Sequence, residues 1–304
     1  MNPLIQAIKN NNPHQLKLLI ELGHDVNVRD EYGNSLLHIA VDKEIPVDWI
    51  RFLIESGADV DIMSDGWHYM ATPLFFAVKR KNLTITKLLI ESEANVNANM
   101  ATGQTPLFEA VIRNSIDLAE LLIANGANVN VKDTKGLSPL YFAACDDSIA
   151  LALFLIKKGA YVNAKDNNGR TPLFEAARGN NKQVAELLIA KGADVNTSDN
   201  IGETPLLEAI NNESTEVAEL LITQGAEVNT RYNNGRTPLI MALWYNNIKV
   251  AKLLIANGAD VNAASTKGLT PLFIANIKAN KRNEPEMHQL LISHGAKPQN
   301  PQKS

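Results

Sequence analysis

The side chains of this 304-residue chain that could bind a metal ion or attack a substrate are six histidines and one cysteine. They are His14, His24, His38, His68, His288, His294 and Cys145. These residues are scattered along the chain, whereas the ligands of a zinc site come in close pairs. No G-x-x-x-x-G-K-S/T or G-x-G-x-x-G sequence follows a strand, so no phosphate-binding loop is indicated. We therefore expect no catalytic residue, no metal site and no cofactor.

Large aromatic side chains offer a different chemistry, because tryptophan and tyrosine dominate the binding energy of many protein interfaces. Residues 61–72 read DIMSDGWHYMAT, three residues longer than the corresponding segment before Pro172 and much richer in large side chains. The residues that crowd this segment are Met63, Trp67, His68, Tyr69 and Met70. Two alternatives stay open for them: they pack onto a neighbouring part of the chain, or they are exposed and contact a partner.

The elements that position these side chains follow from a repeat in the sequence. The pair Pro-Leu, or its equivalent, recurs every 33 residues with a single step of 37 after Leu36. It begins at Pro3, Leu36, Pro73, Pro106, Pro139, Pro172, Pro205, Pro238 and Pro271. The glycine of Gly-Ala-x-Val keeps the same period in most copies. A fixed period of this length is typical of a solenoid, in which each repeat packs only on its neighbours.

One copy, residues 171–204, predicts two helices and a projecting loop. Thr171 is a favoured N-cap residue, and Pro172 suits the first helical position because its missing N–H has no partner there anyway. The second helix has apolar residues at helical spacing, and Gly192 allows it to end. Residues 194–202 then turn, which indicates a loop or hairpin, here called a finger, that projects toward the next repeat.

Two residues depart from this pattern in ways that bear on packing. Glu93 stands where other copies have the glycine that ends the second helix, so we expect either a strained, left-handed backbone there or a slightly altered helix cap. Trp49 aligns with an apolar position of the second helix, so we expect it in the core.

The pattern as a whole is similar to that of the ankyrin-repeat family. Residues 166–196 meet its D-x-x-G finger, T-P-L-H-x-A-A helix, apolar second helix and G-A-D-V-N end nearly letter for letter. The histidine is kept only at His38 and is aromatic or aliphatic elsewhere, which replaces a polar hydrogen bond between repeats with apolar packing. The resemblance implies an all-α solenoid of stacked helix-turn-helix units with projecting β-hairpin or loop fingers.

The resemblance covers nearly the whole chain and implies one domain over residues 1–297, followed by a disordered tail at 298–304. Its nine repeats would begin near residues 2, 30, 64, 99, 132, 165, 198, 231 and 264.

In this family the concave face is built from finger tips and first-helix ends. The helix ends here carry Lys9, Lys43, Lys79, Arg80, Arg113, Arg178, Asn211, Trp244, Tyr245 and Lys278, and a finger carries Tyr232. A second row, one residue after the Phe position of the first helix, contains Glu109, Glu175 and Glu208. Both rows are either solvated helix surface or a groove for a partner. The basic and aromatic members join residues 63–70 as candidate binding residues.

Composition limits the class of partner and the compartment. The formal net charge of −4 and a pI near 5.9 give no general attraction to nucleic acid. No apolar run is long enough to span a membrane, and no secretory signal is visible at the start. A single cysteine cannot form an internal disulfide, so we expect a reducing, cytoplasmic compartment.

These observations predict a monomeric, non-catalytic protein–protein interaction module that does not bind nucleic acid or membranes. Three alternatives stay open: a regulatory subunit, an effector adaptor delivered into another cell, and a binder of small polyanions through the basic helix ends.

Overall fold

The computed structural model of the chain describes residues 2–65, 70–282 and 286–298, and for residues 278–282 only the backbone. These residues form helices, turns and loops, with one isolated antiparallel bridge between Arg29 and Ser35. The prediction of an all-α chain built from helix-turn-helix units is therefore confirmed. The chain divides into two compact units, residues 1–143 with 153–160 (unit 1) and residues 144–152 with 161–304 (unit 2). Each unit is described by itself.

The helices of both units come in pairs. Unit 1 contains α1 (Pro3–Lys9), α2 (Pro13–Glu21), α3 (Leu36–Asp42), α4 (Val47–Glu55), α5 (Pro73–Lys79), α6 (Leu83–Glu91), α7 (Pro106–Ile112) and α8 (Ile116–Ala124). Unit 2 contains α11 (Pro172–Arg178), α12 (Lys182–Ala190), α13 (Pro205–Asn211), α14 (Thr215–Thr223), α15 (Pro238–Trp244), α16 (Ile248–Ala256), α17 (Pro271–Arg282) and α18 (Glu286–Ser293). The border between the units runs through α9 (Pro139–Cys145) and α10 (Ile149–Lys157).

The first helix of a pair begins as the sequence predicts. Thr72 has an extended backbone and accepts a hydrogen bond from the amide of Phe75, while Pro73 occupies the first helical position. In α3 the cap is Ser35, and the side chain of His38 closes a capping box with it. These contacts satisfy backbone groups that the helix itself leaves unpaired.

The turn between the two helices of a pair has a left-handed residue whose identity varies. These residues, with φ between 51° and 59°, are Asn11, Glu44, Lys81, Asn114, Asp147, Asn180, Glu213 and Asn246. Asparagine tolerates this conformation, whereas glutamate and lysine are less suited to it. The packing of the two helices therefore fixes the backbone even where the residue type does not favour it.

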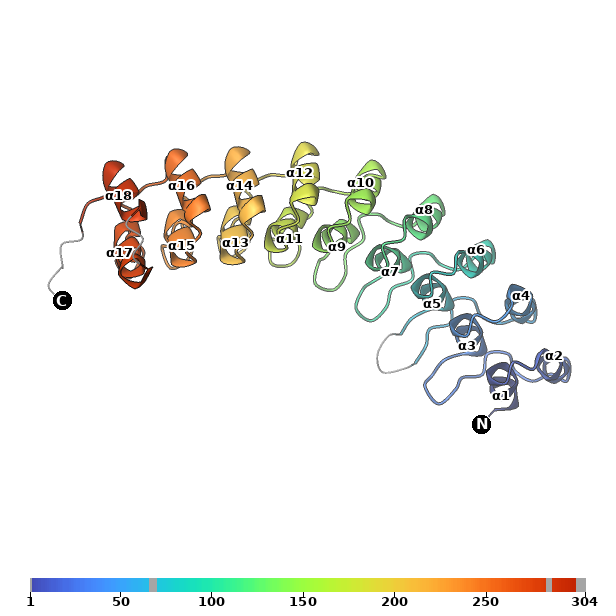
Figure 1. Cartoon of the computed structure of the whole chain (residues 1–304). Coiled ribbons are helices and arrows are strands. Elements are labelled where there is room, and N and C mark those ends of the chain that lie inside the picture. The colour runs from blue at the N-terminus through green and yellow to red at the C-terminus, as the bar shows by residue number, and fades with distance from the viewer. Residues whose placement is uncertain (1, 66–69, 283–285, 299–304) are drawn as a thin grey trace. The chain divides into compact units, whose positions relative to one another are not determined.

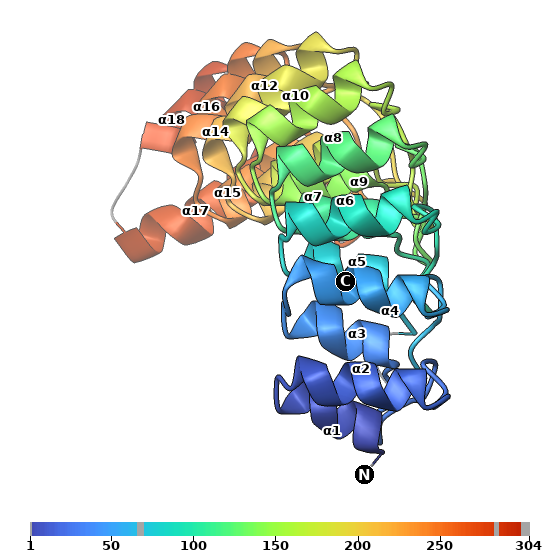
Figure 2. The ribbon, with the colours of Figure 1, turned by 90° about the vertical axis from the view of Figure 1, so that its right-hand side faces the viewer.

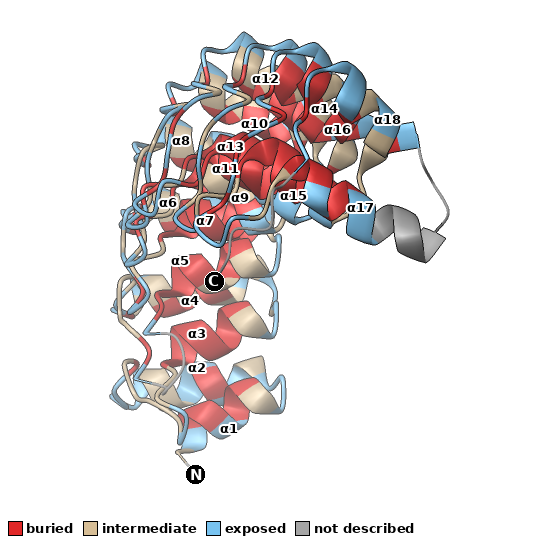
Figure 3. Cartoon of the chain, turned by 90° about the vertical axis from the view of Figure 1, so that its left-hand side faces the viewer, coloured by how far each residue is buried: buried red, intermediate tan, exposed pale blue. Residues whose placement is uncertain are grey.

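Helices this short are marginal in isolation, so packing between repeats must stabilise them. In unit 1 the helices α1, α3, α5 and α7 follow one another in a row, with α4, α6 and α8 in a second row (Figures 1 and 2). In unit 2 the helices α11, α13, α15 and α17 form one row and α12, α14 and α16 another. The first helices carry most of the core, and α3 is buried along nearly its whole length (Figure 3).

The position of the family histidine shows two ways to join repeats. His38 is fully buried, and its Nε2 donates to the carbonyl of Ala71 in the next repeat at 2.8 Å. Its Nδ1 accepts from the backbone of Ser35, so the ring is the neutral Nε2–H tautomer. At the same position Phe108 and Phe174 are also fully buried but make no hydrogen bond through their rings. Apolar packing replaces the polar contact, as expected.

An asparagine at the end of most repeats binds the next repeat with both the oxygen and the nitrogen of its side-chain amide. Asn97 donates to the carbonyl of Gly126 at 2.9 Å and accepts from the amide of Asn128 at 2.9 Å. The same pair of bonds is made by Asn27, Asn163, Asn196, Asn229 and Asn262. We call this series the asparagine ladder.

One step of the asparagine ladder is incomplete. Asp61 replaces the asparagine and accepts from the amide of Asn95, but a carboxylate cannot donate to the next loop. The following residue at the glycine position is Glu93, with φ of 67°. The expectation of a left-handed, non-glycine residue at Glu93 is confirmed, and it coincides with the weakened step.

Candidate functional site

The long finger at residues 61–72 is closed at its base by two hydrogen bonds. The amide of Ser64 donates to the carbonyl of Ala71 at 2.9 Å, and the Ser64 hydroxyl accepts from the amide of Ala71 at 3.1 Å. Met63 is half-buried, whereas Met70 is 50% exposed and has φ of 37°. The other three crowded residues, Trp67, His68 and Tyr69, lie outside the described residues.

The basic helix ends of unit 1 have partners within the chain. The Arg80 guanidinium binds the carboxylate of Asp42 at 2.7 Å, and that of Arg113 binds Glu109 at 2.8 Å. Lys79 places its ammonium 5.9 Å from the centre of the Phe76 ring. Much of the positive charge predicted for this row is therefore compensated internally.

Unit 2 repeats this arrangement at Arg178, which forms an ion pair with Glu175 and contacts the sulfur of Cys145 at 3.9 Å. Burial, followed by the negative charge of Glu175, raises the pKa of the Cys145 thiol. A raised pKa reduces the fraction of thiolate and so makes this cysteine a weak nucleophile.

Sequence reasoning did not recognise these carboxylates as partners of the basic row. Glu109 and Glu175 are buried, and each neutralises an arginine three or four residues further along the same chain. Residues at this spacing are neighbours on a helix, so the spacing was a signal that could have identified the pairs.

A larger charged cluster, which the sequence did not reveal, surrounds Arg170 in unit 2. Its guanidinium lies 3.1 Å from a carboxylate oxygen of Asp199, 2.8 Å from Glu203 and 3.6 Å from Glu208. All three acids are buried, and Phe174 lies against the guanidinium. One positive charge cannot neutralise three carboxylates. Burial, followed by the charge of Glu208, raises the pKa of Glu203 to about 7.

The aromatic residues of the eighth repeat have different roles. Tyr245 is half-buried, and its hydroxyl donates to the side chain of Asn211 at 2.7 Å. Tyr232 is half-buried in its finger. Trp244, at the end of α15, is 42% exposed, and the Arg236 guanidinium lies 4.9 Å from the centre of its ring. The contact between Arg236 and Trp244 was not anticipated from the sequence.

Two hollows lie among the first repeats of unit 1. One is lined by Lys9, Tyr32, His38, Lys43 and Phe76, so it combines two helix-end lysines with a finger tyrosine.

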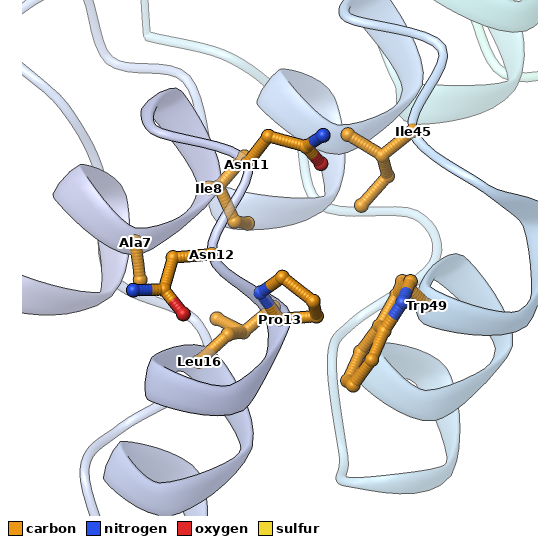
Figure 4. A pocket seen from close by; sticks show the side chains of 8 residues that line it. All are labelled: Ala7, Ile8, Asn11, Asn12, Pro13, Leu16, Ile45 and Trp49. Carbon is orange, nitrogen blue, oxygen red and sulfur yellow. The ribbon is translucent and has the colours of Figure 1, made fainter.

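The second, smaller hollow lies between the first two helix pairs, where Figure 4 shows the Trp49 indole across from Pro13 and Leu16. Trp49 is half-buried and meets Phe52 edge-on, so it lies at the margin of the core rather than inside it.

Metal and membrane chemistry receive no support from the described part of the chain. Within it, no group of three or more histidine, cysteine, aspartate or glutamate side chains is arranged to hold a metal ion. Among the same residues, no helix is both long and apolar enough to cross a bilayer.

Comparison with known proteins points to one family. A family model described as ankyrin repeats (3 copies) matches residues 1–64, 50–133, 126–199, 196–265 and 232–302, which together cover almost the whole chain.

Individual relatives match over short stretches. An ankyrin repeat protein of Fowlpox virus (strain NVSL) is 40% identical over 62 residues, which is 20% of this chain and 14% of the relative. Protein phosphatase 1 regulatory subunit 27 of Homo sapiens is 42% identical over 62 residues, 20% of this chain and 40% of the relative. The B-cell lymphoma 3 protein homolog of Mus musculus is 36% identical over 81 residues, 26% of this chain and 17% of the relative. The matched region is thus less than half of each of these proteins.

Proposed function

Since this chain belongs to the ankyrin-repeat family, we propose that it is a non-catalytic module that binds another protein through its finger tips and first-helix ends. Such a surface is built on short, mutually packed helices, so it loses little conformational entropy when a partner docks. The proposal treats residues 1–297 as one continuous array of repeats.

The observation that supports this proposal is the exposure of large apolar side chains at these positions. In the fingers Tyr32 is 66% exposed, and Met70 and Ile201 are also exposed. Trp244, at the end of α15, is exposed, as is Ile277 within α17. Exposed apolar side chains in fingers and on first helices favour protein contact.

The alternative of a polyanion-binding surface is less well supported. Arg80, Arg113 and Arg178 already bind carboxylates within the chain. Guanidinium groups that are paired in this way attract a polyanion less than free ones, and the net charge of −4 opposes such binding at long range.

The relatives suggest two versions of the same function. A protein phosphatase 1 regulatory subunit is among them, which favours a regulatory subunit that binds an enzyme. An ankyrin repeat protein of a virus is also among them, which favours an effector that acts inside another cell. In both versions we propose a monomer that acts in the reducing cytoplasm, since the one cysteine, Cys145, is unpaired.

An affinity capture with the full-length chain, followed by rebinding of the purified partner, tests the proposal. If the long finger is a hot spot, replacing both Trp67 and Tyr69 by alanine should weaken binding of the partner by about 2 kcal/mol or more, roughly 30-fold in affinity. The helical content should not change. A matched control replaces the exposed Leu18 of α2 and Leu22, the residue directly after α2, which lie outside the fingers and first-helix ends. Equal affinity of the finger variant and the wild type would contradict the assignment of this finger.

A further inference from the structure

Two arginines stand at the same position of two repeats in unit 2, and their surroundings differ. Arg170 and Arg236 each follow a turn glycine with positive φ and precede the threonine that caps the next helix. The guanidinium of Arg170 has three carboxylates around it, from the following finger and from α13. This position of the repeat therefore places an arginine where carboxylates can reach it.

At Arg236 the corresponding acids are replaced. Two repeats after Asp199, Glu203 and Glu208 the sequence has Ser265, Leu269 and Ile274. Within the described part of the chain, the ion pairs involve no atom of Arg236. Its guanidinium lies instead 4.9 Å from the centre of the exposed Trp244 ring.

The backbone holds Arg236 in place for this contact. The amide of Arg236 donates to the side chain of Asn234 at 3.0 Å, and its carbonyl accepts from the amide of Tyr232 at 2.9 Å. A guanidinium that rests on an aromatic face keeps its N–H edge available, and that edge matches the two oxygens of a carboxylate.

We propose that Arg236 and Trp244 form an anchoring site for an aspartate or glutamate side chain of a partner protein. This inference rests on the proposed function and names the chemistry of the partner at one place. The carboxylate binds the N–H edge of Arg236, as the chain's own acids bind Arg170. An apolar residue next to that carboxylate covers Trp244.

The charge and shape around the site favour such a partner. Between residues 230 and 277 the only acidic residue of the sequence is Asp260, and its carboxylate accepts from the amide of Asn262. The same segment contains Arg231, Arg236 and Lys267, and also Lys249 and Lys252 of α16, which pair with Glu219 and Glu286. Ile277 stands at the position of α17 that corresponds to Trp244, and it is exposed. Helix α17 follows α15 in the row, so the site offers apolar surface beside a basic centre.

The test is a selection of random short peptides displayed on phage against the full-length chain, followed by affinity measurements with the synthesised winners. Peptides selected on the wild type should carry aspartate or glutamate next to an apolar residue. Their affinity should fall about tenfold or more for Arg236→Gln and for Trp244→Ala, since each change removes one partner of a charge-assisted or aromatic contact. Thermal unfolding of each variant confirms that it is folded.

A matched control removes the charge of Lys191, which is exposed at the end of α12. Lys191→Gln should leave peptide affinity unchanged, and Arg236→Glu should select peptides with lysine or arginine in place of the acid. Peptides that bind the wild type tightly but are insensitive to both Arg236→Gln and Trp244→Ala would overturn this inference while supporting the proposed function. A selection that yields no binding peptide would contradict both.

Discussion

In the described part of the chain, unit 1 and unit 2 each contain a buried side chain whose pKa is strongly shifted. The two pKa shifts have opposite consequences for stability in acid. In unit 1 the burial of His38 lowers its pKa to about 4, so the ring stays neutral in the folded protein. In unit 2 burial and neighbouring carboxylates raise the pKa of Glu203 to about 7, so the folded protein holds a proton there more tightly. The same fold thus gives its two units opposite responses to acid.

The difference shows which part of a repeat the fold determines and which part the sequence can vary. Both His38 and the cluster around Arg170 are satisfied by groups that the following repeat contributes. At both positions a polar side chain is held by groups that the next repeat supplies. A partner that is missing, as at Arg236, leaves a group available for an external ligand.

The largest expected effect is the difference in stability between equivalent substitutions of Arg170 and Arg236. Arg170→Leu leaves three buried carboxylates without a counter-charge and should lower the free energy of unfolding of the surrounding repeats by about 3–5 kcal/mol near neutral pH. Arg236→Leu removes no partner of a buried acid and should cost about 1 kcal/mol or less.

Native-state hydrogen exchange of the amides in α11, α13 and α15 measures both changes. The loss of unfolding free energy in the Arg170 variant should be smaller at pH 5 than at pH 8, because a protonated carboxyl group is neutral and needs no counter-charge. Similar effects of the two substitutions would mean that the difference between the two arginine sites is unimportant for stability.

The second effect is the opposite pH dependence of the two units. For His38 the unfolded state has the higher pKa, 6.5, and binds protons that the folded state rejects. Stability from this residue is therefore complete above pH 6.5 and is lost as the pH falls toward 4, by about 3 kcal/mol in all. For Glu203 the folded state binds the proton more tightly. Its contribution is complete below pH 4.5 and is lost as the pH rises through 7.

Protection factors measured between pH 4 and 8, corrected for intrinsic exchange, should thus fall with acid around α3 and α5 and rise around α11 and α13. His38→Phe, which copies other repeats, should flatten the first trend, and Glu203→Gln should flatten the second. If protection changed with pH in the same direction in both units, either His38 would not be buried in its neutral form or Glu203 would not be buried in its protonated form.

The smallest effect concerns the incomplete step of the asparagine ladder in unit 1. Glu93→Gly relieves a left-handed residue and should stabilise its repeat by about 1 kcal/mol. Asp61→Asn restores a side-chain donor toward the same loop and should add about 1 kcal/mol. Denaturant unfolding measures the gain in stability of each variant, and the double variant should be more stable than either single variant. Asn97→Asp is the converse control, because it makes a regular step incomplete.

The features of the fold that could be predicted from the sequence are those that depend on the repeat period and on the backbone preferences of neighbouring residues. The 33-residue step, the Thr-Pro helix starts and the left-handed Glu93 were all visible, because each is set by residues close together in the chain. The partners of Arg170 were not visible, since they lie 29 to 38 residues away and no single repeat contains the cluster.

The candidate binding residues were predicted less completely than the fold. The basic row was identified, but its compensation by Glu109 and Glu175 was missed because each row was considered separately. Periodicity places Trp244 on a helix end, whereas its contact with Arg236 depends on how a long side chain folds back along the helix. Side-chain packing of this kind is not determined by spacing alone.

The asparagine ladder has a consequence for how such a chain can change in length. The same two backbone groups of the following repeat, a carbonyl and an amide, bind the side chains of Asn163, Asn196 and Asn229. Removing or duplicating a segment of one full period would bring equivalent atoms back together and re-form every bond across the junction. A change of another size keeps these bonds only where the added residues lie outside the bonded loops, as between Asn262 and Gly295, which are 33 residues apart instead of the 29 between Asn163 and Gly192. The asparagine ladder therefore admits gain and loss of whole repeats directly, whereas other insertions must be accommodated within a repeat.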